Sequence, residues 1–294
     1  WAARYLHTSL VFDSKMWVLG GFTTAAVNNV WYSDTEEVKV QLHVCKTNVI
    51  NSPTTGGECA SSQTWASSTT ATSSNPVSLT YTAQSGDAGT NNFWVFACDE
   101  KALSNSCSAV DSGVNWTQST ANSQWVARDS HTSLVFNSQM WVIGGSAASP
   151  RNDVWYSSSG SSWTQSTANA QWGARYSHTS LVFNDGTNKM WVIGGTTGTR
   201  LNDVWYSSDG ITWTQSTANA QWAARDGHTS LVFNDGTNRM WVIGGTRGTF
   251  LNDVWHSTDG TTWTQSTANS QWVARSLHTS LVFDSKMWVI GGFD

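Results

Sequence analysis

A repeated unit is the feature that most constrains how this chain can fold. In its cleanest copy the unit runs from Trp222 to Gln265 and contains the segments His-Thr-Ser-Leu-Val-Phe, Met-Trp-Val-Ile-Gly-Gly and Asn-Asp-Val-Trp. One arginine holds the same place in each of five copies: Arg4, Arg128, Arg175, Arg225 and Arg275. Repeats of about 50 residues are typical of propellers and solenoids, in which each repeat is one supersecondary unit. The chain is therefore expected to consist of copies of one small structure.

Each copy contains four runs that are typical of β-strands. The runs are short and rich in β-branched and aromatic residues, and the second is apolar throughout, which indicates a strand buried on both faces. Asp-Gly pairs such as Asp209-Gly210 separate the runs, and they favour hairpins with type I′ turns because glycine tolerates positive φ. Each copy is predicted to be a four-stranded antiparallel meander, which makes the chain all-β.

The first copy is interrupted and the fifth is short. Residues 35–111 do not follow the repeat, whereas its fourth strand run resumes after residue 112. The fifth copy ends at Asp294 after two strand runs, and residues 278–292 repeat residues 7–21 with one change. We expect a repeat domain of residues 1–34 and 112–294, with four complete sheets and a half sheet, and an inserted domain of residues 35–111.

Tryptophan explains how the copies are expected to pack. A meander has two apolar faces and cannot bury both alone, so successive copies should stack face to face around an axis. The cleanest copy contains four tryptophans, Trp222, Trp241, Trp255 and Trp263, and the chain contains 20. Their large rings are predicted to fill the spaces between copies rather than to stack on sugars.

The repeat resembles the Kelch-type β-propeller. The resemblance is carried by Arg-x-x-His-Thr, by the Gly-Gly pairs that end each second strand run, by Asn-Asp-Val-Trp-Tyr and by the spaced Trp-Thr-Gln, in residues 1–34 and 112–294. It implies four complete four-stranded blades plus a half blade. It implies little about function, because propellers serve as enzymes, adhesins and scaffolds.

The inserted segment has its own strand pattern and all the cysteines. Alternating runs at residues 38–44, 77–81 and 93–98 are similar to a small immunoglobulin- or fibronectin-like sandwich of the kind carried by bacterial surface proteins. Four cysteines in one small module favour two disulfides and hence a secreted or cell-surface protein, and a zinc site is the alternative. We prefer the pairs Cys45–Cys59 and Cys98–Cys107, while a Cys45–Cys98 bridge stays open.

A polar set recurs in every copy. Each copy has an arginine and, three residues later, a histidine, a set that could form a metal or anion site on the axis. Because every copy carries the pair, we expect it instead to tie neighbouring copies together through charge-assisted hydrogen bonds to carbonyls. The set is Arg4 and His7, Arg128 and His131, Arg175 and His178, Arg225 and His228, and Arg275 and His278.

Catalytic patterns are weak in this sequence. The run Ser257-Thr-Asp-Gly-Thr-Thr-Trp263 resembles the Asp-box of sialidases but is one residue short, and that box is a turn rather than an active site. Aspartates of the Asn-Asp and Asp-Gly pairs are expected to cap backbone amides in turns. The copper radical oxidases that resemble galactose oxidase need a propeller cysteine, which this repeat lacks. We predict no enzyme activity, no cofactor and no metal, with a glycosidase as the alternative.

The loop between the second and third strand runs differs between copies. Variable loops on a rigid scaffold are common places for partners to bind. The predicted contact residues are Arg151, Arg200, Arg247 and Phe250, although neutral drift would explain the same variation.

Charge and composition argue against nucleic acid and the membrane interior as partners. The net charge is -5 and charged residues make up 12% of the chain, so no basic surface is expected for nucleic acid, and no apolar run is long enough for a membrane helix. The preferred hypothesis is a non-enzymatic extracellular structural or adhesive protein. Its open sheet would be completed by strands of another copy, which would build a filament or surface layer. The alternative is a carbohydrate-binding or carbohydrate-acting propeller, lectin- or sialidase-like, and other surface proteins are possible partners.

Overall fold

The computed structural model describes residues 3–34, 40–45, 64–67, 94–99 and 115–294. The chain separates into two compact units, one of Trp1–Tyr32 with Trp116–Asp294 and one of Ser33–Asn115. The first unit contains all five copies of the repeat, numbered here in chain order from the tryptophans that begin them: Trp1, Trp125, Trp172, Trp222 and Trp272.

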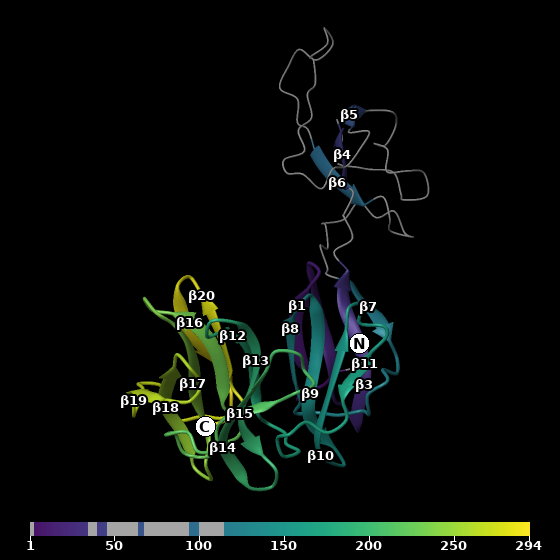
Figure 1. Cartoon of the computed structure of the whole chain (residues 1–294). Coiled ribbons are helices and arrows are strands. Elements are labelled where there is room, and N and C mark those ends of the chain that lie inside the picture. The colour runs from purple at the N-terminus through teal and green to yellow at the C-terminus, as the bar shows by residue number, and fades with distance from the viewer. Residues whose placement is uncertain (1–2, 35–39, 46–63, 68–93, 100–114) are drawn as a thin grey trace. The chain divides into compact units, whose positions relative to one another are not determined.

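Copies 1 to 4 each form a four-stranded antiparallel sheet in which sequence neighbours pair (Figure 1). Copy 1 comprises β1 (Thr8–Phe12), β2 (Lys15–Phe22), β3 (Ala26–Asp34) and β7 (Asn115–Thr120). Copy 2 comprises β8 (Thr132–Phe136), β9 (Gln139–Ala147), β10 (Ser149–Ser157) and β11 (Thr164–Thr167). The predicted four-stranded meander is confirmed.

The remaining copies follow the same plan. Copy 3 comprises β12 (Thr179–Asn184), β13 (Asn188–Thr196), β14 (Arg200–Ser207) and β15 (Thr214–Thr217). Copy 4 comprises β16 (Thr229–Asn234), β17 (Asn238–Thr246), β18 (Phe250–Ser257) and β19 (Thr264–Thr267). Copy 5 consists of β20 (Thr279–Phe283) and β21 (Lys286–Ile290), which pair as a two-stranded sheet. The first strands of successive copies, β1, β8, β12, β16 and β20, lie next to one another.

The turn types differ from the expectation. A type I′ turn needs positive φ at both central residues. At Asp209-Gly210 only the glycine has positive φ, at 73°, so the prediction of a type I′ turn there is wrong. The Ser207 hydroxyl instead accepts the amide hydrogens of Asp209 and Gly210, and the Asp209 carboxylate accepts those of Ile211 and Thr212. Paired positive φ values occur in the hairpin at Asn137 (49°) and Ser138 (56°).

In copies 1 to 4 the Gly-Gly pair lies where two copies meet. In copy 2 the pairing of β9 with β10 shifts register next to this pair, and Gly144 and Gly145 have φ values of 58° and 101°. A Cβ on Gly144 would lie 3.0 Å from Cε1 of His178 in the next copy. A Cβ on Gly145 would lie 2.6 Å from Cβ of His131 in the same copy. The pair is therefore required both by backbone conformation and by the close packing of two histidines.

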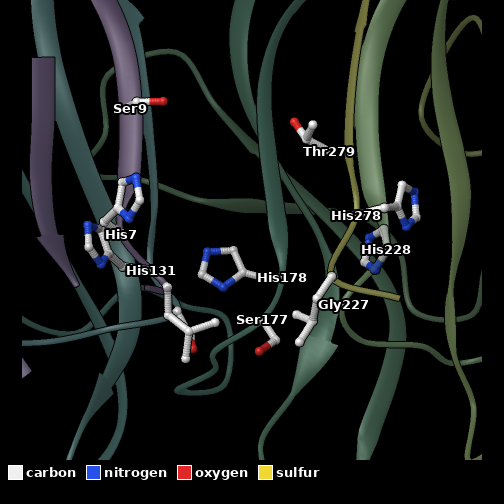
Figure 2. Close-up of a pocket in the computed structure, with 12 residues that line it drawn as sticks. His7, Ser9, His131, Ser177, His178, Gly227, His228, His278 and Thr279 are labelled. Atoms are coloured by element: carbon white, nitrogen blue, oxygen red, sulfur yellow. The ribbon is translucent and has the colours of Figure 1, made fainter. Parts of the chain in front are cut away.

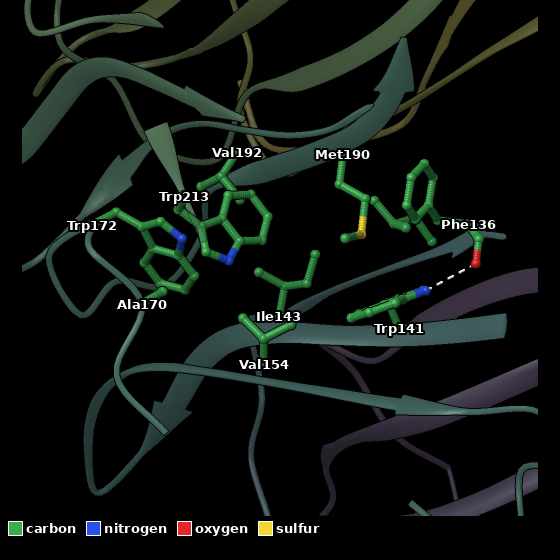
Figure 3. Packing of buried hydrophobic residues seen from close by; sticks show 10 residues of the cluster. Phe136, Trp141, Ile143, Val154, Ala170, Trp172, Met190, Val192 and Trp213 are labelled. Atoms are coloured by element: carbon green, nitrogen blue, oxygen red, sulfur yellow. Dashed lines mark hydrogen bonds between the residues drawn. The ribbon is translucent and has the colours of Figure 1, made fainter. Parts of the chain in front are cut away.

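The hydrophobic core lies between the copies (Figure 3). Leu134, Phe136 and Trp141 of copy 2 pack with Trp172 and Met190 of copy 3 in one buried cluster. Indole groups meet edge to face, as at Trp172 and Trp213, whose ring centroids are 5.8 Å apart with an interplanar angle of 90°. The same arrangement joins copies 1 and 2 and copies 3 and 4. Tryptophan therefore fills the spaces between copies, as the sequence predicted.

The second unit is described only in part. Its described strands β4 (Val40–Cys45), β5 (Thr64–Ser67) and β6 (Trp94–Asp99) form a three-stranded sheet in the order β5-β4-β6. The expected sandwich, its strand at residues 77–81, and Cys59 and Cys107 lie outside the described residues. In the β4–β6 register, Cys45 lies opposite Trp94 and Cys98 opposite Gln41. The disulfide pairing, including the open Cys45–Cys98 alternative, stays a prediction.

Candidate functional site

The Arg-x-x-His segments come together because they precede the first strands, which are neighbours. They surround a cavity of about 460 Å³, which we call the central chamber. Figure 2 shows histidines from all five copies around it. Besides His7, His131, His178, His228 and His278, its lining includes Ser9, Ser130, Ser177, Gly227 and Thr279. Each sheet thus contributes the same short segment to one shared space.

From copy 2 onward, the arginine of each segment joins two copies. The main chain of Arg175 pairs with copy 2: its N–H donates to the Arg151 carbonyl at 2.9 Å and its carbonyl accepts from Gly145 N–H at 2.9 Å. Its guanidinium belongs to copy 3, where it donates to both carboxylate oxygens of Asp203 at 2.7 and 2.8 Å and to the Gly194 carbonyl at 3.0 Å. The guanidinium also lies over the Trp172 ring.

The arginine environments differ at the two ends of the repeat. Arg128 and Arg225 form the same two-oxygen ion pairs, with Asp153 and Asp253. In copy 1 the partner position holds Asn29, whose side-chain oxygen accepts from Arg4 at 2.6 Å. Arg275 donates to the carbonyls of Val273 and Gly291. The guanidinium groups of Arg128, Arg175 and Arg225 are therefore all bound by carboxylates within the sheets.

From copy 2 onward, the histidines are held as neutral rings at the joints between copies. Nε2 of His178 lies 3.0 Å from the Thr132 hydroxyl of the preceding copy, and the pairs Thr8 with His131, Thr179 with His228 and Thr229 with His278 repeat this contact. Burial, together with the charge of the nearby arginine, lowers the pKa of His131 and of His178 to about 3 and that of His278 to about 4. At neutral pH these rings are uncharged.

A main-chain belt runs around the chamber through the residue before each histidine. These five residues, Leu6, Ser130, Ser177, Gly227 and Leu277, all have φ between 51° and 59°. Four hydrogen bonds of 2.7 to 3.1 Å connect them, and in each the main-chain N–H of one residue donates to the main-chain carbonyl of the corresponding residue in the preceding copy. The donor and acceptor pairs are Ser130 and Leu6, Ser177 and Ser130, Gly227 and Ser177, and Leu277 and Gly227. The left-handed backbone turns each amide toward the preceding copy, so the belt links the copies directly.

The predicted contact residues lie at the same end of the sheets as the chamber. Isolated bridges such as Tyr176 with Thr196 and Asp226 with Thr246 pair each Arg-x-x-His segment with the start of the variable loop. The variable loop and the two residues between the arginine and the histidine therefore lie side by side, and both differ between copies. This proximity was not predicted from the sequence. A comparison of the two residues between arginine and histidine would have revealed the second variable segment. In chain order these residues are Tyr-Leu, Asp-Ser, Tyr-Ser, Asp-Gly and Ser-Leu.

The four predicted contact residues are not equivalent. Arg247 lies in the β17–β18 loop and is exposed, and Phe250 at the start of β18 is 41% exposed. Arg200 forms an ion pair with Asp226 at 2.8 Å. Arg151 is half-buried in β10, with its Nε buried and unpaired among the described residues. Arg247 and Phe250 both belong to copy 4, whereas Arg151 and Arg200 come from copies 2 and 3.

The aspartates correct one sequence expectation. Those of the Asn-Asp pairs do not cap turns: Asp153, Asp203 and Asp253 lie within strands and bind the arginines. Burial works against ionisation of Asp153 and Asp253, yet the hydrogen bonds and charge of Arg128 and Arg225 outweigh it and lower both pKa values. Asp209 and Asp259 do cap backbone amides, as expected for the Asp-Gly pairs, whereas Asp185 and Asp235 bind Lys189 and Arg239.

One histidine of the repeat lies away from the central chamber. His256 packs on Trp241 with ring centroids 5.0 Å apart, at the position where copies 1 to 3 have tyrosine. Across the described part of the chain, no three His, Cys, Asp or Glu side chains gather as metal ligands would. That part also contains no helix with the length and apolar character needed to cross a membrane.

Comparison with known proteins identifies the repeat. The family model described as the KLHDC2/KLHL20/DRC7 Kelch-repeats domain matches residues 112–292, more than half of the chain. The solved structure of YjhT is similar in fold, with a TM-score of 0.54 and 14% identity over 98% of this chain and 77% of that one. No curated protein sequence matched. The chain belongs to the Kelch-repeat family.

Proposed function

We propose that the chain is a non-enzymatic binding scaffold whose central chamber takes an uncharged, hydroxyl-rich ligand, that is, a carbohydrate. The observation that carries this proposal is the chemistry of the chamber lining. It consists of serine and threonine hydroxyls, neutral histidine rings and backbone groups, with Leu6 and Leu277 as the apolar contributions. No carboxylate, lysine or arginine side chain belongs to the lining among the described residues.

An uncharged lining favours an uncharged ligand. An ion that enters a buried site loses hydration, and it needs an opposite charge in compensation. The lowered pKa values of His131, His178 and His278 leave these rings without charge at pH 7. A sugar supplies hydroxyl groups that both donate and accept, which matches Ser9, Ser130 and Ser177. A cavity of about 460 Å³ lies within the range of small-molecule sites.

The carboxylates support binding rather than hydrolysis. A glycosidase needs two carboxyl groups, one of which has a raised pKa so that it can act as an acid. In the described part of the chain, the aspartates whose pKa departs from its ordinary value, Asp153, Asp209, Asp253 and Asp259, all have a lowered pKa. These carboxylates are engaged by arginine or by backbone amides, so none of the four is a suitable general acid.

Glycan binding tests the proposal. The chain is applied to an array of neutral oligosaccharides, and the best binder is then measured by calorimetry. Ser177→Leu should weaken binding at least about tenfold, because leucine would enter the chamber in place of a hydroxyl. The backbone tolerates this change, since Leu6 and Leu277 hold the same position with φ of 53°.

A matched control is Ser158→Leu, at an exposed position near the outer hairpin of copy 2, which should bind as the parent chain does. Arg247→Ala reports whether the adjacent loop extends the site. Absence of binding to any neutral glycan, or equal affinity of the Ser177→Leu and parent chains, would overturn the proposal.

The remaining expectations stay predictions. An extracellular location depends on the cysteines of the second unit, two of which lie outside the described residues. The filament or surface-layer role also stays a prediction.

A further inference from the structure

The four interfaces between copies share one set of contacts, and copy 5 displays one half of that set. In each interface the preceding copy supplies an apolar face, a threonine hydroxyl and a carbonyl of the main-chain belt. It also supplies the first glycine of its Gly-Gly pair, against which the histidine ring of the following copy packs. The following copy supplies an apolar face, a histidine and a belt N–H.

The apolar face of copy 5 is exposed. Leu231, Trp241 and Ile243 of copy 4 are buried against Trp272, Met287 and Val289 of copy 5. Their counterparts in copy 5, which are Leu281, Trp288 and Ile290, are 41%, 44% and 48% exposed. Phe283, at the position of Phe233, is exposed beside them. This face has the composition of an interior interface and no covering sheet among the described residues.

The polar elements of the same face are also unoccupied. At Gly20, Gly144, Gly194 and Gly244 a Cβ would lie 2.9 to 3.1 Å from the histidine of the following copy, whereas at Gly291 no atom lies within 4 Å. The Thr279 hydroxyl is exposed and has no histidine partner within the described part of the chain. The Leu277 carbonyl, at the end of the belt, accepts no belt hydrogen bond there.

Copy 1 displays the other half of the set. Met140, Met190 and Met240 are fully buried against the preceding copy, whereas Met16 at the same position is 43% exposed. Val11 is also exposed, while its counterparts Val182 and Val232 pack against the preceding copies. At the start of the belt, the Leu6 N–H donates to no carbonyl among the described residues.

We propose that the β20–β21 face binds the copy 1 face of a second copy of this chain. The sequence supports this occupant, because residues 278–292 repeat residues 7–21 except for Ile290 in place of Leu19. Strands β20 and β21 therefore offer a partner almost the same surface that β1 and β2 offer to copy 2. In the contact, Leu6 N–H donates to the partner's Leu277 carbonyl, and the histidine next to Leu6 packs on Gly291.

The contact is head to tail, so each bound chain keeps one free face. Such heterologous association produces a ring if the rotation closes and a fibre if it does not. It goes beyond the proposed sugar binding and does not depend on it.

Two variants block opposite faces. Gly291→Asn should keep the fold, because asparagine tolerates the left-handed φ of 66° at this position, but its side chain enters the histidine slot. Met16→Asp places a charge on the copy 1 face. Each variant alone should be monomeric in sedimentation velocity, with association weakened at least about tenfold. Ile290→Leu, the matched control, should associate as the parent chain does, because copy 1 has leucine there.

Mixing the two blocked variants gives the sharpest result. Each keeps one intact face, so an equimolar mixture should form a complex of one chain each and nothing larger. Circular dichroism checks that both variants are folded. A parent chain that is monomeric at every soluble concentration would overturn the proposal, and so would parent-like association of the blocked variants. A mixture that stays monomeric while the parent associates would contradict the head-to-tail geometry.

Discussion

Copies 4 and 5 present nearly the same residues in different environments. Leu231 and Trp241 are 8% and 5% exposed because a further copy covers them, whereas Leu281 and Trp288 are 41% and 44% exposed. The arginines differ for another reason: Arg225 binds the Asp253 carboxylate on β18 of its own copy, whereas copy 5 consists of β20 and β21 and Arg275 binds carbonyls. A Kelch sheet therefore acquires a buried core only through its neighbour, as expected for repeats whose stability comes largely from nearest-neighbour interfaces.

The largest expected effect is the difference in the free energy of unfolding between alanine variants of Trp241 and Trp288. Trp241→Ala removes a ring buried between copies 4 and 5 and should lower the free energy of unfolding by about 3–5 kcal/mol. Trp288→Ala removes a half-exposed ring and should cost less than about 1 kcal/mol in the monomer. Urea denaturation at low protein concentration compares them. Equal losses would mean that the face of copy 5 is already packed.

The ion pair gives a second contrast. Asp253→Ala leaves the buried Arg225 guanidinium without its carboxylate and should cost about 3 kcal/mol. Asp253→Asn should cost less, because Asn29 shows that an amide oxygen can accept from the arginine of copy 1. Thermal unfolding of both variants measures the difference. An Asp253→Ala variant as stable as the parent would show that the pair is dispensable.

Acid should weaken the interior joints more than the end joint. The folded pKa of His131 and His178 is about 3, well below the value near 6.5 in the unfolded chain. Below about pH 6.5 the unfolded chain binds protons that the folded chain does not, so stability falls as pH falls. The loss is about 1.4 kcal/mol per histidine for each pH unit down to the folded pKa.

His278 has a folded pKa of about 4, so its contribution to the loss of stability should end at a higher pH than the contributions of His131 and His178. Urea midpoints between pH 7 and pH 4.5 test this, and His178→Asn should show a shallower pH dependence than the parent. A flat profile for the parent chain would contradict the burial of neutral rings.

The smallest contrast concerns two glycines. Gly244→Ala adds a Cβ 3.0 Å from His278 Cε1, whereas Gly291→Ala meets no atom within 4 Å. Both have positive φ, so both changes strain the backbone, but only Gly244→Ala also displaces a neighbour. We expect it to be less stable than Gly291→Ala by about 1 kcal/mol. Thermal unfolding of the two variants would detect this difference.

Some features were predictable because their causes are local. Alternation of β-branched and aromatic residues gave the strands of each copy, and the repeated tryptophans indicated packing between copies. The ion pairs were not predicted, since Asp253 lies in a segment that reads as a turn and meets Arg225 across 28 residues of sequence. The belt was missed because serine and leucine do not by themselves indicate a left-handed backbone.

The sequence by itself determined the meander, the number of copies and the Kelch-repeat family, because short-range periodicity and repetition are written in the order of residues. Only the tertiary structure decided which arginine has a carboxylate partner, where the central chamber lies and which face stays exposed. These depend on contacts between sheets, and such contacts bring together residues that no local pattern connects. Nearly identical segments, at residues 7–21 and 278–292, therefore end in different environments.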